Sequence, residues 1–203
     1  MELASPTPWA GLAGYLVGSV NFALLVARRR GVDLRSVGSG NPGATNVGRA
    51  LGRGWGVFVY LLDALKGAAP AALGLALFDP TAGAAAGGGA FVGHVLPLWH
   101  RFHGGKGVAT LSGAMLALAP VATLSAGLVW LVVFALTRTV GMGSVAFGLA
   151  LGPSALLHGE PRPVLVLAFA GGLTLLVTHR SNLRRFLAER RAARRGDGGG
   201  AAS

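Results

Sequence analysis

The sequence contains no cysteine, which excludes disulfide bonds and thiolate chemistry and leaves the redox compartment open. Charge is scarce as well, because only 12% of the residues are charged, about half the share of a water-soluble domain. Acidic residues are the rarest, with 7 against 18 basic residues and a net charge of +11. Hydrophobic residues make up 52% of the chain. This balance predicts an all-α, polytopic integral membrane protein that forms one compact bundle.

Seven apolar runs are candidates for membrane-spanning helices, which need about 20 largely apolar residues, or fewer where they pack against others. The fourth and fifth runs are short and are divided only near Ala119-Pro120, so they are either two short helices or one broken helix. The first run lacks the basic leader of a signal peptide and precedes Arg28-Arg29-Arg30, which predicts a retained span. The runs cover residues 6–27, 55–78, 82–99, 108–120, 121–136, 141–157 and 163–178.

The basic residues between these runs predict the orientation, because cytoplasmic loops carry the excess of arginine and lysine. Arginine-rich segments follow the first run and the last run, and smaller basic loops contain Lys106 and Arg138. Seven spans place all of them in the cytoplasm, with the N-terminus outside and the C-terminus inside, whereas six spans separate them. We therefore predict seven spans. Residues 1–189 are expected to form a single membrane domain, and residues 190–203 a disordered cytoplasmic tail that is first basic and then rich in Gly and Ala.

Three polar islands interrupt the apolar sequence, and the first covers residues 38–49. Its G-x-G-x-x-G spacing matches a dinucleotide-binding loop, but that motif requires a preceding strand within a βαβ unit, and here a membrane span precedes it. The composition still suits phosphate, because glycines expose backbone N–H groups, hydroxyls and amides add donors, and a guanidinium fits phosphate oxygens. The residues expected to bind are Gly38, Ser39, Gly40, Asn41, Gly43, Thr45, Asn46 and Arg49.

The second island places Lys106 between Gly104-Gly105 and Gly107. A Walker loop has Ser or Thr after its lysine, and Lys106 is followed by glycine, which disfavours ATP binding. A lysine held by glycines still offers a point charge to phosphate. The third island ends the last apolar run and combines a histidine, which exchanges a proton near neutral pH, with polar neighbours. Its residues are His179, Arg180 and Asn182.

Several ionisable residues lie within or beside the apolar runs. Asp63 and Lys66 share a helix face at i, i+3 spacing, so they are either a structural ion pair or a support beneath a functional site. His94, His100 and His103 raise the question of a metal site. No cysteine or acid accompanies them, and no H-E-x-x-H motif is present, so we expect no metal.

The three islands together resemble the cytoplasmic motifs of the bacterial acyl-phosphate:glycerol-3-phosphate acyltransferases, the PlsY family. Residues 38–49 look like the first motif, residues 93–110 like the second, and His179-Arg180-x-Asn182 like the third, and the segment Asp63-x-x-Lys66-Gly67 also fits. The resemblance extends from the first span to about residue 189. This family often carries serines after the fifth span, where this chain offers only Ser144.

The resemblance implies that an acyl group moves from acyl phosphate to the 1-hydroxyl of glycerol 3-phosphate, giving lysophosphatidic acid and inorganic phosphate without a cofactor. It implies a bacterial cytoplasmic (inner) membrane location with the active site on the cytoplasmic face, contact with membrane lipid, and an upstream enzyme that supplies acyl phosphate. The expected catalytic residues are Ser39, Arg49, Lys106 and His179. The expected substrate-binding residues are Gly38, Gly40, Asn41, Gly43, Thr45, Asn46, Gly104, Gly105, Gly107, Ser144, Arg180 and Asn182. The expected supporting residues are Asp63, Lys66 and His94.

The sequence also bears on alternative mechanisms and functions. The general base is either His179 or a phosphate oxygen of the substrate, and a covalent acyl-Ser39 intermediate is disfavoured because no nearby acid completes a triad. A transporter of a phosphorylated molecule is a competing class, but internal repeats and polar groups near the membrane midplane, typical of transporters, are not evident. Nucleic-acid binding is not expected, because the positive charge follows the membrane orientation pattern. The His-x-x-x-x-Asp signature of other glycerophosphate acyltransferases is absent.

Overall fold

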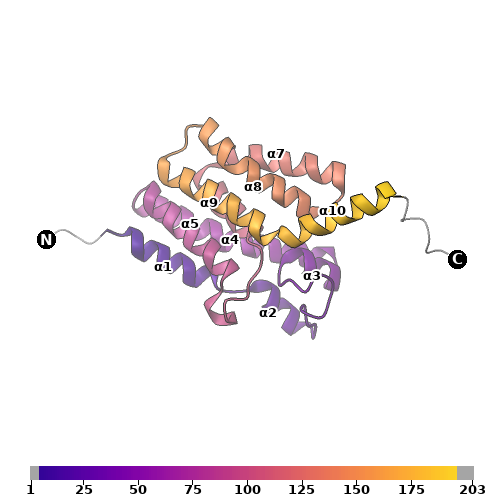
Figure 1. Ribbon diagram of the computed structural model, residues 1–203. Coiled ribbons are helices and arrows are strands. Elements are labelled where there is room, and N and C mark those ends of the chain that lie inside the picture. The colour runs from indigo at the N-terminus through magenta and orange to yellow at the C-terminus, as the bar shows by residue number, and fades with distance from the viewer. Residues whose placement is uncertain (1–4, 196–203) are drawn as a thin grey trace.

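The computed structural model describes residues 5–195, and every element within that range is helical, which confirms the predicted all-α class (Figure 1). The elements are α1 (Thr7–Gly18), α2 (Phe22–Arg29), α3 (Ala44–Leu51), α4 (Arg53–Leu77), α5 (Pro80–Val95), a short 3-10 turn η1 (Leu98–His100), α6 (Val108–Leu118), α7 (Pro120–Thr137), α8 (Val140–Leu157), α9 (Arg162–Thr178) and α10 (Arg180–Arg195).

Four helical segments are long and apolar enough to cross a membrane: residues 7–29 taken together, α4, α7 and α8. The pair α9 and α10 passes the same test only jointly and bends by 54° between the two helices, so it adds a fifth segment only if the bent pair is one span. The helix α6 is apolar but shorter. The count of seven spans and the orientation remain predictions from the sequence.

Polar residues shape the helices more finely than hydropathy indicates. The predicted first run contains two helices, because the side-chain oxygen of Asn21 accepts the backbone N–H of Leu24 at 3.0 Å and so begins α2. The first polar island, residues 38–49, contains the first turns of the helix α3. The fourth and fifth runs are two separate helices that divide at Ala119, and Pro120 opens α7.

Small residues allow the helix backbones to approach closely. On α1, a Cβ added to Gly14 or Gly18 would overlap the backbone of α5 at Ala86 or Ala90. Between α4 and α6, a Cβ on Gly67 would likewise overlap the backbone of Thr110. Glycine at such contacts lets helices pack backbone to backbone, as in many membrane bundles. The frequent glycines within the spans therefore serve packing at these positions.

The main core is formed by α4, α5, α6, α7, α8 and α9, and a smaller core lies between α2, α3 and α4. Figure 1 shows α2, α3 and α10 at one end of the bundle, away from the α8–α9 connection. At that other end Ser125 Oγ lies 3.3 Å from Nε2 of His158. The helix α10 continues through Arg195, so residues 190–195, expected in a disordered tail, are helical. The rest of that predicted tail, residues 196–203, lies outside the described residues.

Candidate functional site

The first polar island folds around the side chain of Asn46, which is 1% exposed. Its Nδ2 donates to the carbonyl oxygens of Leu34 at 3.0 Å and Val37 at 2.9 Å, and its Oδ1 accepts the backbone N–H of Ser39 at 3.1 Å. Gly38 has a φ of +59°, and a Cβ there would overlap Oδ1 of Asn46. Both amide hydrogens of Asn46 are therefore used within the turn, and Asn46 shapes the loop instead of donating to a substrate.

The second island wraps around His94. The backbone N–H of Gly105 donates to the carbonyl oxygen of His94 at 3.1 Å. A Cβ on Gly105 would overlap the imidazole Nε2 of His94, and a Cβ on Gly104 would overlap its carbonyl oxygen. Gly107, with a φ of +91°, then begins α6. This tight packing against His94 fixes the position of the loop that carries Lys106.

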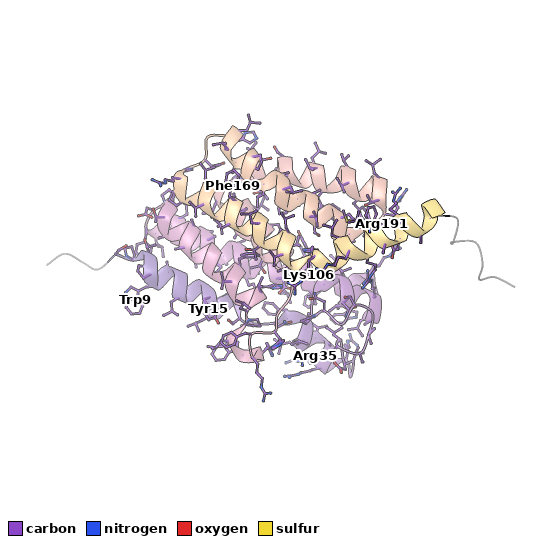
Figure 2. All side chains as sticks on the ribbon, in the orientation of Figure 1. Trp9, Tyr15, Arg35, Lys106, Phe169 and Arg191 are labelled. Atoms are coloured by element: carbon purple, nitrogen blue, oxygen red, sulfur yellow. The ribbon has the colours of Figure 1, made fainter. Side chains whose placement is uncertain are left out.

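Lys106 meets the third island where α9 passes into α10, near the centre of the molecule in Figure 2. Its Nζ donates to Oδ1 of Asn182, and Thr178 Oγ1 donates to its carbonyl oxygen at 3.1 Å. Asn182 also lies against Gly141 at the start of α8, where a Cβ would overlap its amide group. Segments more than 70 residues apart in the sequence are thus joined at Lys106, through its contacts with Asn182 and Thr178.

His179 follows the last residue of α9 and is 4% exposed. Its Nδ1 lies 2.9 Å from the carbonyl oxygen of Leu175. Because a carbonyl only accepts hydrogen bonds, Nδ1 carries the hydrogen and Nε2 keeps its lone pair. Burial and the positive charge of Lys106 lower the pKa of His179 to about 4, against the opposing effect of the bond to Leu175. The imidazole is therefore neutral at physiological pH.

Positive charges crowd around Lys106. Burial lowers the pKa of Lys106, and the neighbouring charges of Arg185 and Arg49 lower that pKa further. Arg185 was not among the residues predicted for the site. Its position one helical turn after Asn182, on the same face of α10, is the signal in the sequence that identifies it.

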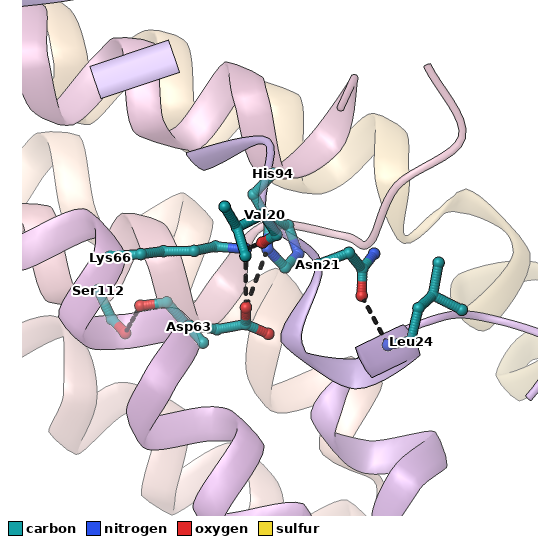
Figure 3. Close-up of polar contacts among 8 residues, drawn as sticks. Val20, Asn21, Leu24, Asp63, Lys66, His94 and Ser112 are labelled. Atoms are coloured by element: carbon teal, nitrogen blue, oxygen red, sulfur yellow. Dashed lines mark hydrogen bonds and ion pairs between the residues drawn. The ribbon is translucent and has the colours of Figure 1, made fainter. Parts of the chain in front are cut away.

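Asp63, Lys66 and His94 form a buried cluster behind the second island, shown in Figure 3. Lys66 Nζ lies 2.8 Å from Asp63 Oδ1 and also donates to the carbonyl oxygen of Val20 at 2.6 Å. The same Oδ1 lies 3.6 Å from Nδ1 of His94. The predicted i, i+3 pair is confirmed, and it extends through His94 to Gly105 of the second island.

All three islands line one cavity of about 2020 Å³. Its cations are Arg35, Arg49, Arg53, Lys106, Arg138, Arg180 and Arg185, whereas its acids are Asp63, which already pairs with Lys66, and Glu189. Such an excess of positive charge suits phosphate dianions. The sequence-predicted residues that line the cavity are Ser39, Gly40, Asn41, Gly43, Thr45, Asn46, Arg49, Asp63, His94, Gly104, Gly105, Lys106, Gly107, Ser144, His179, Arg180 and Asn182.

Two of the predicted residues, Gly38 and Lys66, lie behind the cavity wall and act only through the turn and the ion pair described above. Ser144 lines the cavity, and its hydroxyl donates to the carbonyl oxygen of Val140 at 2.9 Å. Within residues 5–195, no group of three or more His, Asp and Glu side chains is arranged to hold a metal ion.

The cavity continues from the charged end into an apolar groove between α4, α6 and α7. The groove is partly open at the surface of the bundle, since Leu61 is 58% and Leu124 is 66% exposed. We define the apolar groove by Val57, Tyr60, Leu61, Leu116, Leu124, Gly127, Trp130 and Phe134. A cationic end joined to an apolar groove fits a molecule with a phosphate head and a hydrocarbon chain.

Comparisons with known proteins agree on one family. The family profile described as glycerol-3-phosphate acyltransferase matches residues 9–189. The chain is 47% identical over 190 residues to the glycerol-3-phosphate acyltransferase of Myxococcus xanthus, covering 91% of this chain and 96% of that protein. It is 41% identical over 178 residues to the Aquifex aeolicus enzyme of the same name, covering 87% and 93% of the two chains.

Solved structures show the same similarity. The crystal structure of PlsY (YgiH), an integral membrane glycerol 3-phosphate acyltransferase in its glycerol 3-phosphate form, superimposes with a TM-score of 0.87 at 39% identity, covering 92% of this chain and 94% of that one. The lysophosphatidic acid form gives a TM-score of 0.85 at 37% identity with the same coverage.

Proposed function

Since the chain belongs to the glycerol-3-phosphate acyltransferase family, we propose that it transfers an acyl group from acyl phosphate to the 1-hydroxyl of glycerol 3-phosphate. The products are lysophosphatidic acid and inorganic phosphate. The observation that carries the proposal is the single cavity in which Ser39, Arg49, Lys106 and His179 converge beside the apolar groove. Both substrates carry phosphate, and one also carries a long hydrocarbon chain.

The residues of the cavity suit separate roles. Lys106 uses one of its three N–H donors on Asn182, which leaves two for phosphate oxygens. Arg49 offers a bidentate fork to a second phosphate edge. The hydroxyl of Ser39, an exposed residue, stabilises in this proposal the oxyanion that develops when the substrate hydroxyl attacks. Acyl phosphate is a mixed anhydride and is already activated, so orientation and charge stabilisation supply the catalysis.

The proton of the attacking hydroxyl passes to the leaving phosphate in this proposal. An imidazole with a pKa of about 4 is a weak base at neutral pH, whereas the second ionisation of a phosphate monoester lies near pH 6, at roughly the working pH. The hydroxyl oxygen bonds to the carbonyl carbon, the carbonyl–phosphate oxygen bond breaks, and the proton ends on the phosphate. Nε2 of His179 accepts a hydrogen bond from the hydroxyl and so orients it, but His179 does not keep the proton.

The proposed setting is the bacterial cytoplasmic membrane, with the cavity on the cytoplasmic face. It is supported by the arginine-rich segments, because Arg35, Arg138 and Arg185 all line the same cavity. The groove opens toward lipid, so the acyl donor enters and the product leaves sideways through the bilayer. An upstream enzyme must either phosphorylate a free fatty acid or cleave an activated acyl group with inorganic phosphate to supply the donor.

The test is phosphate release by the purified protein from palmitoyl phosphate and glycerol 3-phosphate, with palmitoyl-CoA as the control donor. We expect phosphate only when both substrates are present, an equal amount of lysophosphatidic acid, and no product from palmitoyl-CoA. Equal use of palmitoyl-CoA would refute the choice of donor. Uptake of glycerol 3-phosphate into vesicles without turnover would instead identify a transporter.

A further inference from the structure

One face of α7 lines the cavity at helical spacing. Leu124, Gly127, Trp130 and Phe134 belong to the apolar groove, and Arg138 just after the helix lines its charged end. At about 1.5 Å per residue, Leu124 and Arg138 are about 21 Å apart along the helix. A zigzag of bonds of about 1.5 Å advances about 1.25 Å per carbon, so a chain of about sixteen carbons spans about 19 Å. The groove is therefore about as long as such a chain.

Gly127 leaves a gap in the middle of this face. A Cβ added there meets no atom within 4 Å. At Gly67 and Gly113 a Cβ would overlap the backbone of a neighbouring helix, so those glycines serve helix packing. Gly127 has no such neighbour, although glycine costs a helix about 1 kcal/mol relative to alanine. The empty volume at Gly127 therefore adds to the groove and not to a helix contact.

Steric fit is the property by which this groove can distinguish acyl chains. The chain of acyl phosphate reaches the groove from lipid, which is as apolar as the groove, so the transfer brings little hydrophobic gain. Forcing a chain against an added side chain is unfavourable in the same way as overpacking a core. The side chains that narrow the groove therefore determine how long an acyl chain it can hold.

Accepting the acyl transfer proposed above, we propose that Gly127 is a specificity-determining residue whose missing side chain lets long acyl chains pass to the deep end of the groove. Along the axis of α7, Gly127 lies about 10 Å from Phe134 and about 16 Å from Arg138, toward the N-terminus of the helix. These depths correspond to about eight to thirteen carbons. A chain of eight carbons ends at or above Gly127, whereas a chain of sixteen carbons extends past it.

The test compares Gly127→Leu with the matched control Ala135→Leu, which adds a similar side chain to the exposed surface of the same helix outside the cavity. The kcat/KM of each purified protein is measured with octanoyl phosphate and with palmitoyl phosphate at fixed glycerol 3-phosphate. We expect Gly127→Leu to lose about tenfold with palmitoyl phosphate and to keep its rate with octanoyl phosphate. Ala135→Leu should keep the wild-type ratio between the two donors.

The proposal is decided by the ratio of the kcat/KM for palmitoyl phosphate to the kcat/KM for octanoyl phosphate. An unchanged ratio in Gly127→Leu, or equal losses with both donors, would overturn the role of Gly127. Should Gly127→Leu fail to fold, Gly127→Ala decides by the same ratio, with an expected shift of the same sign and smaller size. A wild-type protein that releases no phosphate from either donor refutes the acyl transfer itself, whereas an active wild type with an unshifted variant refutes only the role of Gly127.

Discussion

Replacing Gly105 with alanine tests whether the loop around His94 positions Lys106. The added Cβ would overlap the imidazole Nε2 and lie 3.0 Å from Cε1 and 3.2 Å from Cδ2. The ring cannot move away easily, because it is buried and its other nitrogen faces Asp63. The loop must therefore shift by about 1 Å to restore an ordinary contact distance.

The magnitude follows from this displacement. A misplacement of about 1 Å at a reacting group costs about 10²-fold in rate, and overpacking a buried site costs about 1–3 kcal/mol of stability. We expect Gly105→Ala to lose about 10²-fold in kcat/KM for glycerol 3-phosphate. The matched control is Gly54→Ala at the exposed start of α4, where a Cβ meets nothing within 4 Å.

The assay measures phosphate release over a range of glycerol 3-phosphate concentrations, with the thermal midpoint of each variant recorded in the same detergent. Gly54→Ala should match the wild type in both measurements. Activity of Gly105→Ala within about twofold of the wild type would refute the positioning role of His94 and its loop.

Two further predictions concern ionisable groups. The neutral imidazole of His179, with its pKa near 4 in the folded protein and near 6.5 when unfolded, binds fewer protons folded than unfolded between those values. Stability should therefore fall as the pH drops from 6.5 to 4, by up to about 1.4 kcal/mol per pH unit; a thermal midpoint of His179→Gln with the same pH slope as the wild type would contradict this. Asp63→Asn leaves Lys66 buried without its acid and should cost about 3–5 kcal/mol. The double variant with Lys66→Met should recover part of that loss, and equal melting of the single variant and the wild type would show that the pair is not required.

The sequence predicts the helical class and the convergence of the islands, because both depend on the order of apolar and basic segments along the chain. Long uncharged runs predict helices in a membrane, and islands rich in glycine and basic residues predict phosphate binding. The structure confirms that Lys106 and Asn182 meet, although they lie far apart in the chain. The common side of the membrane stays a prediction from the basic residues between the apolar runs.

Local breaks and individual roles could not be predicted in the same way. Hydropathy averages over a window, so the cap at Asn21 and the helix α3 within a polar segment escape it. The role of Asn46 depends on which backbone carbonyls its amide reaches, and the part of Arg185 depends on the bend between α9 and α10. Both are consequences of tertiary geometry, which composition does not contain.

The orientation of the cavity is the central claim, since the proposed function requires that glycerol 3-phosphate reach the cavity from the cytoplasm. The chain has no cysteine, so single cysteines can be introduced as Ser36→Cys beside the cavity and Arg162→Cys at the opposite end of the bundle, both at exposed positions. A membrane-impermeant maleimide applied to intact cells should label Arg162→Cys, and it should label Ser36→Cys only after permeabilisation. Labelling of Ser36→Cys in intact cells would place the cavity outside and contradict the account.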